Sequence, residues 1–167
     1  MSRRVCILIN PKLPFTVIKS EIDSLGRYFI LDIMVLDQIL TFVCIYGHNT
    51  DRPEFFVDLQ NHLHNFQGDT IFIGDDFNFV FNLDLDKVGG RRGTSFKARN
   101  AYLALMSTFD LIDIWRKKNP LSNKFTWSSN VLPGIHCRLD FFLVSRQLNS
   151  NVSAVSLSPG IQSDHSL

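Results

Sequence analysis

One short stretch, residues 70–78, constrains the fold of this chain more than any other. Thr70–Ile73 is a run of β-branched and aromatic residues, typical of a strand buried on both faces of a sheet. The run ends at Gly74, and two carboxylates follow directly. Catalytic groups collect at such strand ends because the backbone there is rigid and the loop beyond is open to substrate. The stretch predicts an α/β fold in which Asp75 and Asp76 hold a metal ion, transfer a proton or merely cap a turn.

Strand-like and helix-like patterns alternate along the rest of the chain. Apolar residues at three-to-four spacing predict helices at 53–66 and 96–109, and Asp51 is expected to cap the first of them. This order indicates a single α/β domain over residues 1–167. The remaining strands are expected at 5–9, 15–22, 28–36, 39–46, 125–128, 136–144 and 152–157.

Composition excludes several classes of protein. With 167 residues, 45% of them hydrophobic and 15 of them Phe, the chain can bury a core and is not a disordered segment. The odd, widely spaced set of Cys6, Cys44 and Cys137 predicts buried free thiols rather than disulfides or a zinc site. We see no signal peptide and no run of membrane-spanning length, so we expect an intracellular protein with no membrane partner.

The net charge of +1 is too balanced to predict a nucleic-acid binder that acts through its overall charge. A local patch of positive charge does exist in the loop after residue 86. It is either a solvated loop or a contact for phosphate groups of a nucleic acid, with the arginines as the substrate-binding candidates. Its members are Lys87, Arg91, Arg92, Lys97 and Arg99.

Polar groups follow, or interrupt, four of the expected strands. This layout is that of a phosphoester hydrolase, which needs a water activator, a carboxylate to orient it, donors for phosphoryl oxygens and a divalent metal. An Asp–His pair with an amide and a phenol would fill three of these roles. The polar sets are Tyr46 with Asn49, Asp76 with Asn78, Asp140 alone, and Asp164 with His165.

The same segments resemble the motifs of the endonuclease/exonuclease/phosphatase superfamily, which includes AP endonucleases and pancreatic deoxyribonuclease. Gly74–Asn78 resembles its Gly-Asp-Phe-Asn motif, and Ile45–Asn49 resembles its Tyr-x-Pro-Asn motif. Arg138–Phe142 is similar to the Arg-Ile-Asp-Tyr strand, and Ser163–His165 to the terminal Ser-Asp-His. The endonuclease domain of LINE-type retrotransposons is the most similar member in such details as Asn82–Lys87.

The resemblance implies a fold and a set of roles. The fold would be a two-sheet α/β sandwich flanked by helices, and the substrate would be DNA. His165 would activate the attacking water, Asp140 would orient its imidazole, and Asp164 would be a metal ligand. Asp76 would handle the leaving oxygen or the nucleophile's proton. The phosphate oxygens would be held by Asn78, Tyr46 and Asn49.

By the same resemblance the domain is expected to be incomplete. The superfamily's first strands, which carry an Asn and the main metal-binding Glu, have no counterpart before Val5, and a final strand is expected beyond Leu167. Mg²⁺ or Mn²⁺ would then be weakly held. We expect an impaired, DNA-nicking endonuclease of retrotransposon origin, for which nuclear residence is plausible. The alternatives are a catalytically inactive fragment and a phosphatase of the same superfamily.

Overall fold

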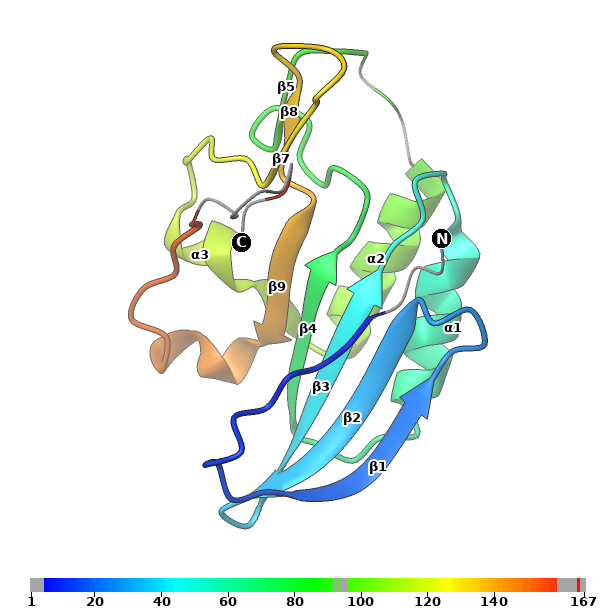
Figure 1. Cartoon of the computed structure of the whole chain (residues 1–167), viewed down its shortest axis with the longest axis vertical. Coiled ribbons are helices and arrows are strands. Elements are labelled where there is room, and N and C mark those ends of the chain that lie inside the picture. Colours follow the sequence, from blue (N-terminus) through cyan, green and yellow to red (C-terminus); the bar gives the residue numbers. More distant parts are fainter. Residues whose placement is uncertain (1–4, 92, 94–95, 159–164, 166–167) are drawn as a thin grey trace.

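A computed structural model of the chain describes residues 5–91, 93, 96–158 and 165. Over these residues the chain forms two sheets and several helices (Figure 1). In chain order the elements are β1 (Thr16–Ile22), β2 (Tyr28–Val35), β3 (Gln38–Tyr46), α1 (Pro53–Leu63), β4 (Thr70–Asp76), β5 (Lys87–Val88), α2 (Phe96–Thr108), β6 (Leu111–Asp113), α3 (Ile114–Lys118), β7 (Trp127–Ser128), β8 (His136–Cys137), β9 (Asp140–Ser145) and a 3-10 helix (Arg146–Ser150).

The larger sheet has six strands in the order β1-β2-β3-β4-β9-β6, and the smaller has three in the order β5-β8-β7. Strand β4 runs parallel to β3 and antiparallel to β9. Helices α1 and α2 lie together behind the large sheet in Figure 1, and the small sheet extends beyond the upper end of β9. The predicted fold class, two sheets with flanking helices, is confirmed.

The main core lies between the large sheet and helices α1 and α2. Alternate residues of β2, β3, β4 and β9 point to this side, as the two-residue period of a strand requires. The three-to-four spacing of both helices supplies the facing residues, and each fully buried aliphatic side chain contributes about 2 kcal/mol. Fully buried members of this core are Ile30, Ile45, Leu59, Ile73, Tyr102, Leu105 and Leu143.

The predicted hairpin between the second and third strands is confirmed. Leu36 and Asp37 connect β2 to β3, with φ of 47° and 63°. Positive φ at both central residues is the geometry of a type I′ turn, whose twist matches that of the flanking strands. β1 pairs only with β2 and stands at the sheet edge, as expected for residues 15–22.

Two expected strands are absent from the described part of the chain. Residues 5–9 and 152–157 have the right composition but form no ladder with a neighbouring segment. An apolar run becomes a strand only where its backbone N–H and C=O groups find a partner strand. Val152 and Val155 instead pack against the small cluster that includes Ile112 and Val144.

The strand expected over residues 136–144 is divided in two. β8 belongs to the small sheet and β9 to the large one, and Arg138 and Leu139 form the junction between them. The alternating pattern could not reveal the break, because a strand that changes sheets keeps its two-residue period on both sides.

Asp51 does not cap the helix that follows it, which corrects the prediction. The N-cap position of α1 is Arg52, which makes no side-chain capping bond. The Asp51 carboxylate instead accepts backbone N–H bonds from Lys97 (3.4 Å) and Ala98 (2.7 Å), in the first turn of α2. The loop after β3 is therefore tied to the start of a helix 46 residues away.

We predict that Asp51→Ala lowers the free energy of unfolding by about 1 kcal/mol, the usual effect of losing a side chain that caps a helix start. Urea denaturation followed by circular dichroism measures it. Asp58→Ala, on the exposed side of α1, is the matched control and should be close to neutral. Equal losses in the two variants would contradict the capping role.

Candidate active site

The polar residues at the strand ends lie at one level across three neighbouring strands. Tyr46, the last residue of β3, is the register partner of Asp76, the last residue of β4. Asp76 is in turn the partner of Asp140, the first residue of β9. Because β4 and β9 are antiparallel, the end of one strand meets the start of the other. Sheet register alone therefore brings the two acids together.

His165 completes the group. Its Nδ1 lies 2.8 Å from Oδ2 of Asp140, and its backbone forms an isolated β-bridge with Trp127. We call Asp76, Asp140 and His165 the acid–imidazole cluster, because one ligand atom from each lies within 4.8 Å of the others. No other set of three His, Cys, Asp or Glu side chains is so close among the described residues. Two carboxylates and an imidazole are a donor set that fits a divalent cation.

Burial changes the proton affinity of both acids. Asp76 is 6% exposed, and loss of solvation raises its pKa to about 6, a shift that the Asn78 N–H opposes and the Asp140 charge reinforces. Burial likewise raises the pKa of Asp140, against the hydrogen bonds from Thr126 and His165. A carboxyl group with a pKa near 6 can hold or release a proton close to neutral pH, which suits general acid–base chemistry.

The end of β4 and the turn after it are strained and tightly held. Asp75 and Asn78 have φ of 103° and 54°, conformations that non-glycine residues adopt mainly where the surroundings enforce them. The backbone N–H of Asn78 donates to Asp76 Oδ1 (2.8 Å), and its side-chain amide donates to the Gly47 carbonyl (3.1 Å). Gly47 must be a glycine, since a Cβ there would overlap the Phe77 carbonyl. The loops after β3 and β4 thus hold Asn78 beside the cluster.

Thr126 is a site residue that sequence reasoning missed. Its side chain is buried, and Oγ1 accepts the backbone N–H groups of Leu139 (2.9 Å) and Asp140 (3.0 Å). Trp127, the next residue, bridges to His165. The segment therefore contacts both members of the Asp140–His165 pair. One sequence signal was a hydroxyl residue between Phe125 and Trp127 in a short apolar strand.

We predict that Thr126→Val lowers the free energy of unfolding by about 1–3 kcal/mol, because two buried N–H groups lose their acceptor. Thr126→Ser retains the oxygen and should lose clearly less. Chemical denaturation of the two variants beside the parent protein measures the difference. If valine and serine destabilise equally, the hydroxyl is not the acceptor that matters.

Some predicted residues are not joined to the cluster. Asn49 and Arg91 are exposed, and within the described ranges no hydrogen bond or ion pair links either to Asp76, Asp140 or His165. Asp164 and Arg92 lie outside the described residues, so their predicted roles as metal ligand and substrate contact stay predictions. Tyr46 lies at the correct strand end, with the Arg27 guanidinium 5.8 Å from its ring centre.

The basic patch is partly engaged in contacts within the chain. Arg99 donates to the Phe81 carbonyl (3.3 Å) and stacks 5.0 Å from that ring, while Lys87 donates to the Arg91 carbonyl (2.6 Å). These contacts fold the loop onto α2 and leave Lys97 exposed. Contact of this patch with nucleic-acid phosphates stays a prediction.

The three cysteines are free, as predicted, but only Cys137 is buried; Cys6 is exposed and Cys44 half-buried. The Cys44 thiol donates to Asp75 Oδ2 at 3.1 Å. Burial, reinforced by that carboxylate, raises the pKa of Cys44 to about 12. The raised pKa means that Cys44 stays a neutral thiol throughout the physiological range.

We predict that iodoacetamide at pH 8 alkylates Cys6 and spares Cys44. At that pH a thiol with a pKa of about 12 is thiolate in only about one molecule in ten thousand, and its reaction rate should rise about tenfold per pH unit. Peptide mapping by mass spectrometry identifies the modified residue. Cys6→Ser should abolish the fast reaction; fast alkylation of Cys44 in that variant would contradict the raised pKa.

No model of a known protein family matches the chain. The chain is 26% identical over 145 residues to the Transposon TX1 uncharacterized 149 kDa protein of Xenopus laevis. The aligned stretch covers 84% of this chain but only 11% of the Xenopus protein.

Two solved structures share the fold. The AP endonuclease LMAP of Leishmania major superposes with a TM-score of 0.71 at 21% identity, covering 86% of this chain and 54% of its own. The endonuclease domain of TRAS1, a telomere-specific non-LTR retrotransposon, superposes with a TM-score of 0.62 at 12% identity, covering 91% of this chain and 77% of its own. The chain has the fold of the endonuclease/exonuclease/phosphatase superfamily. The predicted resemblance to this superfamily and to its retrotransposon members is therefore confirmed at the level of the fold.

The chain spans about half the length of the Leishmania AP endonuclease LMAP. None of its described helices is long and apolar enough to cross a membrane.

Proposed function

We propose that the chain is the hydrolase part of a retrotransposon-type endonuclease, which cleaves a phosphodiester bond of DNA with a divalent cation, Mg²⁺ or Mn²⁺. The observation that carries the proposal is the acid–imidazole cluster at the shared ends of β3, β4 and β9. Groups from residues 76, 140 and 165 meet there on a fold that AP endonucleases share. Buried acids without a function at such a point would only cost free energy.

His165 is the proposed water activator. Asp140 Oδ2 lies 2.8 Å from Nδ1, so the carboxylate favours the tautomer with a proton on Nδ1, in which Nε2 is the nitrogen that accepts a proton. Asp140 also stabilises the imidazolium that forms when the water proton is transferred. The side chain of His165 is 29% exposed, so a water or phosphate can approach it.

Asp76 and Asn78 are proposed to act on the other side of the phosphate. With a pKa of about 6, Asp76 can give a proton to the leaving oxygen or take one from the nucleophile. The Asn78 amide is held by Gly47, and the Tyr46 phenol and the Asn49 amide would add further donors for phosphoryl oxygens. Donors held in place by the fold stabilise the charge that develops in the transition state.

Asp164 is the proposed ligand of the cation, and the Asp140 carboxylate is a further candidate. When bound, the cation would neutralise negative charge on the phosphoryl oxygens. We expect weak binding and slow turnover, because Asp140 is already engaged with His165 and Mg²⁺ prefers several free oxygen ligands. Arg91 and Arg92 would contact the DNA backbone, and a chromosomal substrate would require nuclear residence.

We predict that the purified chain converts supercoiled plasmid to nicked circles in the presence of Mg²⁺ or Mn²⁺ and that EDTA abolishes the reaction. His165→Ala and Asp140→Asn should each lower the rate by about 10²- to 10⁴-fold, the range typical of a lost general base. Agarose gel electrophoresis with time measures the rate. His64→Ala is the matched control and should retain full activity, since His64 is an exposed histidine whose ring lies 4.9 Å from that of Phe109, centre to centre, at a tilt of 45°.

Three results would contradict this proposal. Nicking that survives His165→Ala would come from a contaminating nuclease. If the folded parent protein produces no nicked circles even at high concentration, the chain is the catalytically inactive fragment of the alternative interpretation. Release of phosphate from a 3′-phosphorylated duplex without any nicking would indicate the phosphatase alternative.

A further inference from the structure

A buried network of charges lies beside the acid–imidazole cluster and takes no part in the chemistry proposed above. Its centre is Arg138, two residues before Asp140 and 1% exposed. Arg138 Nε donates to Asp86 Oδ1 (2.8 Å) and Nη2 donates to Asp86 Oδ2 (3.2 Å), so the pair is bidentate. Nη2 also donates to Asp113 Oδ2 (2.6 Å).

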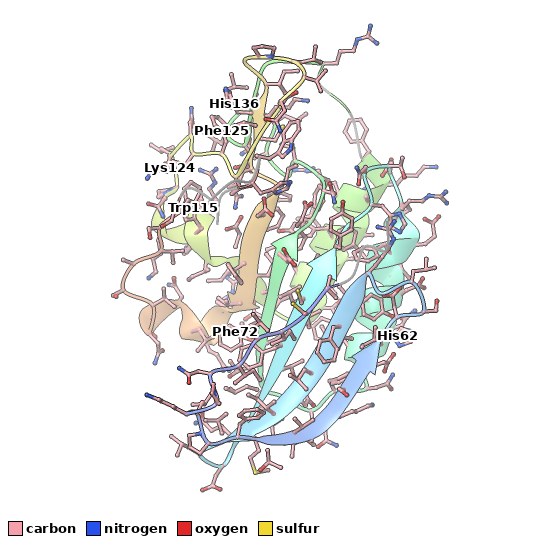
Figure 2. The ribbon with its side chains drawn as sticks, in the orientation of Figure 1. His62, Phe72, Trp115, Lys124, Phe125 and His136 are labelled. Carbon is pink, nitrogen blue, oxygen red and sulfur yellow. The ribbon has the colours of Figure 1, made fainter. Side chains whose placement is uncertain are left out.

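Aromatic rings and a second arginine enclose this pair. The Arg138 guanidinium lies 5.2 Å from the Trp115 ring centre and 4.9 Å from that of Phe141. Arg116 bonds Asp86 as well, and its guanidinium lies 4.9 Å from the ring centre of Trp115, a residue of α3 that Figure 2 labels. Burying such charges costs solvation free energy that their attraction only partly offsets. A role in fixing geometry would explain why the network exists.

The network joins segments that are distant in the sequence. Asp86 is in the loop after β4, Asp113 ends β6, and Arg138 is at the junction of the two sheets. Within the loop, Asp86 N–H donates to the Asn82 carbonyl (2.7 Å) and Asn82 N–H donates to Asp86 Oδ2 (3.2 Å). The Asn82–Lys87 motif therefore folds in a way that presents the Asp86 carboxylate to Arg138.

Backbone hydrogen bonds of the junction connect this charge network to the segments that carry Asp76 and Asp140. Arg138 N–H donates to the Asp86 carbonyl (2.9 Å). The next residue, Leu139, accepts at its carbonyl the N–H of Phe77 (2.9 Å). Phe77 directly follows Asp76, and Leu139 directly precedes Asp140. A displacement of the junction must therefore change how Asp140 stands relative to Asp76.

We propose that Asp86 and Arg138 are positioning residues that fix Asp140 against Asp76. The proposal rests on the proposed hydrolase function for its effect on rate, but its structural part is independent of that function. It also assigns a physical role to the Asn82–Lys87 motif, which the chemistry of the site does not use.

We predict that Asp86→Asn and Arg138→Gln each lower kcat for plasmid nicking by about 10- to 100-fold, because small misplacements of catalytic groups have effects of that size. KM should change little, since both side chains are buried, at 0% and 1% exposure, where a substrate cannot reach them. The double variant should be no slower than the slower single variant, because the two residues act as one unit.

Amide hydrogen exchange tests the same proposal without any activity. In Asp86→Asn the amides of Phe77, Leu139 and Asp140 should exchange at least about tenfold faster than in the parent protein, through local opening. Ser145→Ala is the matched control, since Ser145 Oγ is buried at the other end of β9 and accepts the Ile71 N–H (2.8 Å). That variant should speed exchange at Ile71 while keeping kcat and the junction amides unchanged.

Arg116→Gln provides a milder variant should Asp86→Asn fail to fold, because the Arg116 side chain is 17% exposed and supplies only one partner of Asp86. Faster exchange at Leu139 and Asp140 in a folded variant, absent in Ser145→Ala, supports positioning. Exchange at these amides that matches the parent protein overturns the positioning role. A variant of equal stability to Ser145→Ala whose kcat falls no further than that of Ser145→Ala overturns it as well. If the parent protein does not nick DNA, the proposed function fails while the exchange result still decides the positioning role.

Discussion

The in-register pairing of β4 with β9 is the constraint on which the rest of the site depends. It sets Asp76 opposite Asp140, and the parallel pairing of β3 with β4 sets Tyr46 beside them. Burial at this strand end raises the pKa of both carboxyl groups, and at Asp76 the Asp140 charge adds to the shift. His165 then offsets part of the pKa shift of Asp140 through its contact with that carboxylate. The acid–base character of the site is thus a consequence of sheet register.

Several buried polar groups around this pairing are bonded by segments remote in the sequence, whereas Arg138 Nη1 has no hydrogen-bond partner among the described residues. Thr126 accepts the amides of the junction before β9, and Asp86 and Asp113 pair with Arg138 beneath it. Gly47 allows the loop after β3 to approach the turn after β4 closely enough to bond Asn78. Each contact replaces solvation that burial removes, so each of these bonded groups has a defined partner in the folded chain.

The differences between prediction and structure have specific causes. Residues 5–9 have the composition of a strand, but a strand also needs a pairing neighbour, and the described part of the chain places none there. The run 136–144 keeps one alternating pattern although it passes from one sheet to another, so the junction at Arg138 was invisible in the sequence. Asp51 resembled a cap for the helix that follows it, yet it bonds the start of α2, since capping requires only a nearby N–H group.

The sequence by itself determined the α/β class, the two amphipathic helices, the hairpin from β2 to β3 and the residue types of the site, because period, turn chemistry and motif order are local properties. Only the tertiary structure decided that Asp76, Asp140 and His165 converge, that Thr126 and Arg138 support them, and that Asn49 and Arg91 remain exposed. Convergence depends on strand register and long-range hydrogen bonds, which join residues whose separation along the chain carries no periodic signal.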